Sequence, residues 1–223
     1  MHSFSHMPKN ADSPLILIAA VLVLAGCSDP ASNVPQTSAT APMPVPTAAG
    51  ASGIEYRVRA GSSVGFTGSK VTGSHDGGFT NVVGSFRVGD GKLAGAPEIT
   101  ISMRSLWSDN DRLTGHLISP DFFDVAQYPV SSFTITSIEP AGENHQVNGN
   151  LNLHGVTKGI SFPAQVSISP ETAALKAEFA INRRDFNINY PGKPNDLIRD
   201  QVVIRLDIQA TPGPERPEDR LIQ

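Results

Sequence analysis

Apolar and polar residues alternate with a period of two along most of this chain, and this pattern most limits how it can fold. Four stretches show it clearly: residues 54–59, 147–153, 175–182 and 202–209. A period of two places apolar side chains on one face of a β-strand and polar ones on the other. Shorter segments around Phe86, Ile99–Met103, Phe133–Ile138 and Ile160–Ile168 repeat the pattern. The sequence predicts eight or nine strands, nearly all with one face in water.

Strands with one apolar face close into a barrel or pack into a sandwich, and the alternation alone does not separate the two. The 20 glycines, 18 prolines and 17% charged residues are typical of a turn-rich β protein. One segment departs from the pattern. Residues 109–117 begin with polar capping residues and place Leu113 and Leu117 four positions apart, which predicts a short helix.

Cys27 is the only cysteine of the 223 residues, and it ends the sequence Leu-Ala-Gly-Cys. An apolar run over residues 15–25 precedes it and is too short to span a membrane as a helix. Bacterial lipoprotein signal peptides end in this way, so residues 1–26 are predicted to be such a signal and Cys27 the lipidated N-terminus. The alternative is an ordinary signal peptide that leaves one buried cysteine. A single cysteine forms no disulfide within the chain.

Residues 27–53 consist mostly of serine, threonine, alanine and proline and carry one charge, Asp29. Such a composition buries little apolar surface, so it predicts a disordered linker between a membrane anchor and the folded part. The prolines of residues 212–223 predict a disordered tail. One folded domain is therefore expected over residues 54–211. The net charge of −4 gives no general attraction to nucleic acid.

Several histidines and aspartates are candidates for a binding or catalytic site. The four histidines after the signal lack metal-binding spacing, so neither a metal nor a cofactor is expected. His75 and Asp76 lie in Gly-Ser-His-Asp-Gly-Gly, which is either a site for a head group or a proton, or a polar hairpin turn, and the turn is favoured. Asp121 and Asp124 flank two phenylalanines. They are either an acid/base pair or, as favoured, turn caps beside Phe122 and Phe123 plugging one barrel end.

Two adjacent arginines, Arg183 and Arg184, follow the strand that ends near residue 182. Guanidinium groups bind phosphate or carboxylate head groups through paired hydrogen bonds. They equally brace a loop by pairing with an aspartate. Both interpretations stay open from the sequence.

Three strings in a fixed order resemble the YceI-like family. They are Asp-Phe-Phe-Asp-Val followed by Tyr-Pro (residues 121–129), Leu-His-Gly-Val-Thr-Lys (153–158) and Ile-Asn-Arg-Arg-Asp-Phe (181–186). The resemblance covers residues 54–211 and implies a lipocalin-like, closed antiparallel β-barrel of about eight strands with one short helical segment. It also implies binding of a polyisoprenoid chain, such as a quinone or a polyprenyl phosphate, without catalysis. Gly159 and Asn187 depart from the residues common in the family, proline and glycine respectively.

The resemblance and the anchor together predict a membrane-tethered, non-catalytic lipid-binding barrel in the cell envelope, facing the periplasm, with the outer membrane favoured over the inner. The expected partners are an isoprenoid-type lipid and the membrane. Polar groups of the loops, His75, Arg183 and Arg184, are expected at the ligand's head group. The alternative is a structural or partner-binding envelope lipoprotein with a solid core. The side chains expected to line the lumen are Phe66, Phe86, Met103, Phe133, Phe162, Phe179 and Ile181.

Overall fold

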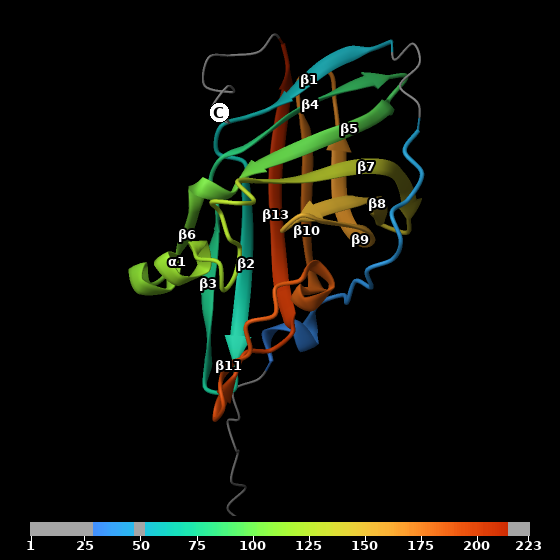
Figure 1. Cartoon of the computed structure of the whole chain (residues 1–223). Helices are drawn as coiled ribbons and strands as arrows, with labels where there is room; N and C mark the ends of the chain where they lie inside the picture. The colour runs from blue at the N-terminus through green and yellow to red at the C-terminus, as the bar shows by residue number, and fades with distance from the viewer. Residues whose placement is uncertain (1–28, 47–51, 214–223) are drawn as a thin grey trace, which may run out of the picture.

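A computed structural model describes residues 29–46 and 52–213 of the chain (Figure 1). The predicted signal peptide, Cys27 and the tail beyond residue 213 lie outside the described residues. Strands account for most of the folded part. In chain order they are β1 (Ile54–Val58), β2 (Ser63–Lys70), β3 (Gly73–Phe79), β4 (Val82–Gly89), β5 (Lys92–Ser102), β6 (Leu106–Ser108), β7 (Val130–Ala141), β8 (Asn144–Leu153), β9 (Val156–Ile168), β10 (Ala173–Asn182), β11 (Gly192–Lys193), β12 (Asp196–Leu197) and β13 (Gln201–Pro212).

Eight antiparallel strands form a closed barrel in the order β1-β4-β5-β7-β8-β9-β10-β13, and the pairing of β13 with β1 closes it. The predicted barrel is confirmed. One edge of β13 pairs with β10 along its length. The other edge pairs first with β2, over Val203–Asp207, and then with β1, over Ala210–Pro212. Pro212 therefore belongs to the last strand rather than to the tail, because at the strand's end its missing N–H interrupts no ladder.

Strands β2, β3 and β6 extend the sheet beyond the barrel, and the helix α1 (Asp111–Ile118) follows β6 at this side (Figure 1). The helix predicted over residues 109–117 is confirmed with a shift of one or two residues. Its N-cap is Asn110, whose side-chain oxygen accepts a hydrogen bond from the amide of Leu113.

The glycine-rich segment 73–78 is strand β3 and not the hairpin turn that the sequence favoured. The turn lies just before it, between β2 and β3. The glycines are needed for close packing instead. A Cβ atom on Gly77 would lie 2.4 Å from the ring of Phe66 and 2.7 Å from the carbonyl oxygen of Trp107. Glycine in a strand interior often marks such a close approach of two chain segments.

Residues 29–46, named here the N-terminal strap, lie along the outside of the barrel (Figure 1). The strap begins with a short 3-10 helix, η1 (Pro30–Asn33). It then runs between β9 and β10, which pair with each other only over Gln165–Ile168 and Ala173–Lys176. Beyond that pairing, the backbone groups of both strands form hydrogen bonds with the strap. Ala180 of β10 bonds to Pro35 and Thr37, and Gly159 of β9 exchanges two hydrogen bonds with Thr40.

The disordered linker expected from composition is therefore wrong over residues 29–46. The physical reason lies in the barrel's outer face. Ala180 and Val203 stand among polar residues on that face and need cover, which the strap supplies by burying Ala31 to 2% exposure against them. Without the strap, the β9 and β10 backbone groups between the parted strands would also lose their partners.

Gly159 provides the space for the strap. A Cβ atom there would lie 2.7 Å from both the carbonyl oxygen of Ala41 and the hydroxyl of Thr40. A proline, common at this position in the resembling family, would in addition lack the N–H that donates to Thr40 at 3.2 Å. Glycine in place of the common proline at position 159 therefore allows the strap to pack against β9.

The second departure, Asn187, follows the 3-10 helix η3 (Arg183–Phe186) with φ 59° and ψ 19°, in the left-handed region that asparagine tolerates. Among the described residues, no helix combines the length and apolar character required to cross a bilayer.

Candidate functional site

An apolar cavity of about 240 Å³ occupies the barrel interior. Alternate residues of the strands line it, as the period-two pattern requires: β13 contributes Val202, Ile204, Leu206, Ile208 and Ala210. For comparison, an apolar cavity of about 150 Å³ in another protein stays dry and binds benzene. The cavity is large enough for a segment of an apolar chain.

The barrel is hollow along much of its length rather than filled by its own side chains. The cavity is lined from the β9–β10 turn, at Ile168 and Ala173, to the segment after η3, at Ile188. Several lining side chains remain partly accessible although they point inward: Phe86, Phe133, Leu151, Leu175, Ile204, Leu206 and Ile208. A close-packed core would bury them completely.

All seven side chains expected at the lumen line this cavity: Phe66, Phe86, Met103, Phe133, Phe162, Phe179 and Ile181. Two of them, Phe162 and Phe179, stack face to face across β9 and β10 with ring centroids 4.1 Å apart. Their contact with a ligand stays a prediction. The lining residues of β13 were not among those expected, although the same alternation indicates them, since Val202, Ile204, Leu206 and Ile208 share one face.

Phe122 and Phe123 line the cavity near the α1 side. The edge of Phe123 meets the rings of Phe66 and Phe79, with centroids 6.3 and 5.8 Å away. The segment forms a turn, as favoured from the sequence, but its turn contacts come from the backbone of Asp124 and not from the two carboxylates. Asp121 pairs with His116 at 3.0 Å, and Asp124 adopts φ 43° while its carbonyl oxygen accepts from the amides of Gln127 and Tyr128.

Arg183 is the charged residue of the cavity lining, and its side chain is only 5% exposed. Its Nε donates to the carbonyl of Arg199 at 3.0 Å, and its terminal nitrogens donate to the carbonyls of Ile188 (2.6 Å) and Ile198 (3.3 Å). A carboxylate oxygen of Asp200 lies 3.2 Å away. Burial lowers the pKa of the guanidinium, and Asp200 opposes this effect. Arginine stays protonated at neutral pH even so.

These contacts tie η3 to the segment that leads into β13. Of the two interpretations of the arginine pair, the structure shows the brace: Arg184 also bonds Asp200, at 2.6 Å. Arg184 is exposed and lies outside the cavity lining. Arg183 is thus the only one of the three predicted head-group residues that the structure places at the cavity.

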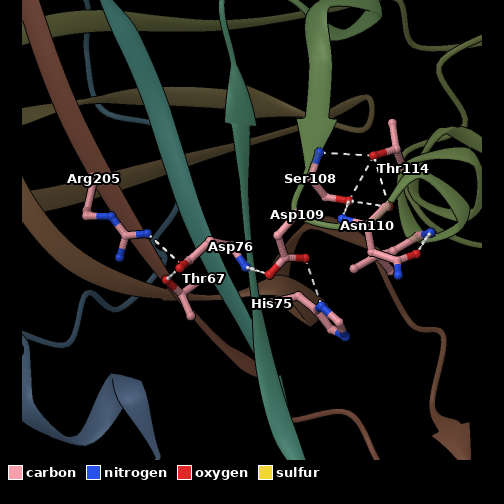
Figure 2. A network of polar contacts seen from close by, with 9 residues as sticks. Thr67, His75, Asp76, Ser108, Asp109, Asn110, Thr114 and Arg205 are labelled. Atoms are coloured by element: carbon pink, nitrogen blue, oxygen red, sulfur yellow. Dashed lines mark hydrogen bonds and ion pairs between the residues drawn. The ribbon is translucent and has the colours of Figure 1, made fainter.

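His75 lies on β3 in a polar network outside the cavity lining (Figure 2). Its Nδ1 is 2.8 Å from the carboxylate of Asp109, which also accepts from the amide of Asp76. Asp76 in turn accepts from the hydroxyl of Thr67 and from Arg205 at 2.9 Å. The head-group roles of His75 and Arg184 stay predictions that no contact with the cavity supports.

This network lowers the pKa values of both aspartates. The hydrogen bond from Thr67, followed by those from Arg205, lowers the pKa of Asp76. The backbone N–H of Asp76 and the ring of His75 lower the pKa of Asp109. The network therefore joins β2, β3, β13 and the segment before α1 through ionised carboxylates.

His154 and His145 take no part in the polar network around His75. His154 bonds the carbonyl of Phe186 at 3.2 Å and packs against Tyr128, while His145 lies on β8. Over residues 29–46 and 52–213, no three side chains of histidine, cysteine, aspartate or glutamate come together in a way that could hold a metal.

Comparisons with known proteins agree with this architecture. A UPF0312 protein of Pseudomonas putida (strain W619) is 32% identical over 136 residues, which cover 54% of this chain and 71% of the relative. Among solved structures, BcnA of Burkholderia cenocepacia superposes with a TM-score of 0.61 at 24% identity and covers 68% of this chain and 98% of that one. A polyisoprenoid binding domain from Saccharophagus degradans superposes with a TM-score of 0.60 at 19% identity, over 72% and 99%.

The two structural likenesses show that the fold is shared. The YceI-like domain itself matches residues 56–210, from within β1 to within β13, and so covers nearly the whole barrel. The chain therefore belongs to the YceI-like family.

Proposed function

We propose that this chain is a non-catalytic binding protein for an apolar isoprenoid-type lipid, a quinone or a polyprenyl chain, held inside the barrel. The observation that carries the proposal is the apolar cavity of about 240 Å³ within a closed barrel. The domain from Saccharophagus degradans, similar in fold, is described as binding polyisoprenoids, which supports the ligand class.

The energetics suit a branched hydrocarbon chain. Burying an isoprene unit of roughly 100 Å² at about 25 cal/mol/Å² stabilises the complex by about 2.5 kcal/mol before entropic costs. A few units would then give micromolar binding. The alternative of a structural lipoprotein with a solid core requires a filled interior, against which the partly accessible Leu206 and Ile208 count.

The test is extraction of the purified chain with organic solvent, followed by mass spectrometry and by titration with a quinone. A variant that fills the cavity, Leu206→Trp, should lose the co-purifying lipid and bind added quinone at least about tenfold more weakly. The matched control is Asp207→Trp, one residue along β13 on the outer face, where the carboxylate makes exposed contacts with Lys176 and Gln209. No lipid and no quinone binding in the unsubstituted chain would favour the structural role.

The proposal includes membrane tethering. Lipidation of Cys27 would hold the barrel at the envelope, facing the periplasm, with the outer membrane favoured by Ser28 after the cysteine. Two or three acyl chains, at about 0.8 kcal/mol per buried methylene, make such an anchor stable. Cys27→Ser should release the chain from membranes and leave quinone binding unchanged. Loss of binding by the purified variant would contradict this division of roles.

A further inference from the structure

The strap begins at a defined place on the barrel, only two residues after Cys27. Asp29 caps η1 by accepting from the amide of Ala31 at 3.0 Å, and its second oxygen lies 3.4 Å from the guanidinium of Arg199. In the sequence, one residue, Ser28, separates Asp29 from Cys27. A lipid on Cys27 would hold this end of the barrel against the bilayer.

The same end carries two exposed apolar side chains. Val71 in the β2–β3 turn is 58% exposed and Leu197 in β12 is 52% exposed. Asp196 joins the two segments, because it accepts from the amide and hydroxyl of Thr72, at 3.2 and 3.0 Å, and pairs with Lys70. We name this surface the tip: the turn Val71–Thr72 together with β11 and β12.

The tip lies next to the start of the strap. The amide of Arg199, the partner of Asp29, donates to the carbonyl of Ser69 at 2.9 Å. Leu197 is two residues before Arg199, and Val71 is two residues after Ser69. Figure 1 shows η1 and β11 at the lower end of the molecule, opposite β1 and β4.

Most charges of this end are paired with one another, while Lys193 of β11 is exposed and forms no ion pair with the described residues. Lys70 pairs with Asp196, Arg199 with Asp29, and Arg184 with Asp200. Paired charges cost less to bring to a lipid interface than isolated ones, and they leave Val71 and Leu197 as the groups with most to gain from leaving water. The cavity also reaches this end, where Gly68 and Ile198 belong to its lining.

We propose that the tip is the membrane-contacting surface of this protein, and that Val71 and Leu197 enter the interfacial region of the bilayer. The inference rests on the lipid anchor of the proposed function. It assigns the orientation: the cavity end lined by Gly68 and Ile198 faces the lipids, while β1 and β4 point away from them. A lipid chain would then pass between bilayer and cavity over a short path.

The test places a tryptophan at the tip. In a Trp107→Phe background, which removes the single native tryptophan, Leu197→Trp is compared with Ile54→Trp. Ile54 begins β1 and is 53% exposed, which matches it to Leu197, and Figure 1 shows β1 at the other end of the molecule. The full-length lipid-anchored chain is reconstituted in phosphatidylcholine vesicles with or without bromine on the acyl chains.

Brominated acyl chains should lower the fluorescence of Leu197→Trp by about twofold or more, since interfacial side chains reach the acyl boundary, and should leave Ile54→Trp unchanged. Equal quenching at both positions, quenching at Ile54→Trp only, or none at either position would overturn the proposal.

Solvent extraction of the same samples separates the proposed lipid binding from the proposed orientation. Quenching without bound lipid contradicts the binding function alone, and bound lipid without quenching contradicts the orientation alone. A chain that fails to float with vesicles contradicts both the anchor and the orientation.

Discussion

The side chain of Asn150 holds the backbone of Met43 through both of its polar atoms. Its Oδ1 accepts from the amide of Met43 at 2.7 Å, and its Nδ2 donates to the carbonyl at 2.9 Å. Asn150 lies on β8 and is buried, while Met43 lies near the end of the strap. This pair fastens a segment rich in proline and alanine to a barrel 107 residues away in sequence.

Asn150→Ala should free the far end of the strap. The loss of two hydrogen bonds at a buried site should lower the free energy of unfolding by about 1–2 kcal/mol. Amides of residues 37–43 should exchange with deuterium faster, while β5 and β7 stay protected. The control is Asn152→Ala on the same strand, where the side chain bonds Thr157 and not the strap. Equal exchange in both variants would contradict the clamp.

Gly159→Ala should disturb the same segment from the other side. Its Cβ would force Ala41 and Thr40 away from 2.7 Å, at an expected cost of about 1–2 kcal/mol in unfolding free energy. The two substitutions should not be additive, because a strap already released by Asn150→Ala no longer crowds position 159. Denaturant unfolding of the single and double variants measures this coupling, and full additivity would count against it.

Much of the barrel could be predicted from sequence because its strands alternate cleanly, and the seven side chains expected at the lumen line the cavity. The strap could not, since its composition resembles that of disordered chains and its partners lie far along the sequence. The sequence indicates the strap only indirectly, because Ala180 and Val203 are apolar residues on a strand face that is otherwise polar. Segment 73–78 was misjudged because glycines that admit the ring of Phe66 look like turn glycines.

The arginine pair shows a different limit. The sequence identifies Arg183 and Arg184 as a pair, but only the tertiary structure shows that Arg183 is buried and Arg184 is exposed. Arg183 follows the last residue of β10 and turns toward carbonyls of residues 188–199. No local pattern encodes that partner set.

Arg183→Met should therefore be far more destabilising than Arg184→Met. The first leaves three backbone carbonyls without a donor, at an expected cost of about 2–4 kcal/mol, while the second removes an exposed ion pair of at most about 1 kcal/mol. Urea unfolding followed by circular dichroism measures both. Similar midpoints for the two variants would refute the role assigned to Arg183.

The stability of the chain should fall in acid. The pKa values of Asp76, Asp109 and Asp196 are lowered in the folded state, the last through Lys70 first and then Thr72. The folded chain thus binds these protons less readily than the unfolded one, whose aspartates titrate near pH 3.9. Their stabilisation is complete well above about pH 4 and is lost as the pH falls through the folded-state values. In the double variant Asp76→Asn/Asp109→Asn, the free energy of unfolding should decline less steeply from neutral to acid pH than in the unsubstituted chain. An unchanged decline would contradict the stabilising role of the network.

The location of the ligand is the central claim, and photocrosslinking tests it most directly. A polyprenyl chain carrying a diazirine is bound to the purified full chain, irradiated and mapped by peptide mass spectrometry. Crosslinks should fall on inward residues such as Phe162, Phe179 and Leu206, and Leu206→Trp should abolish them. Crosslinks confined to the outer face, or unaffected by Leu206→Trp, would contradict a lipid held inside the barrel.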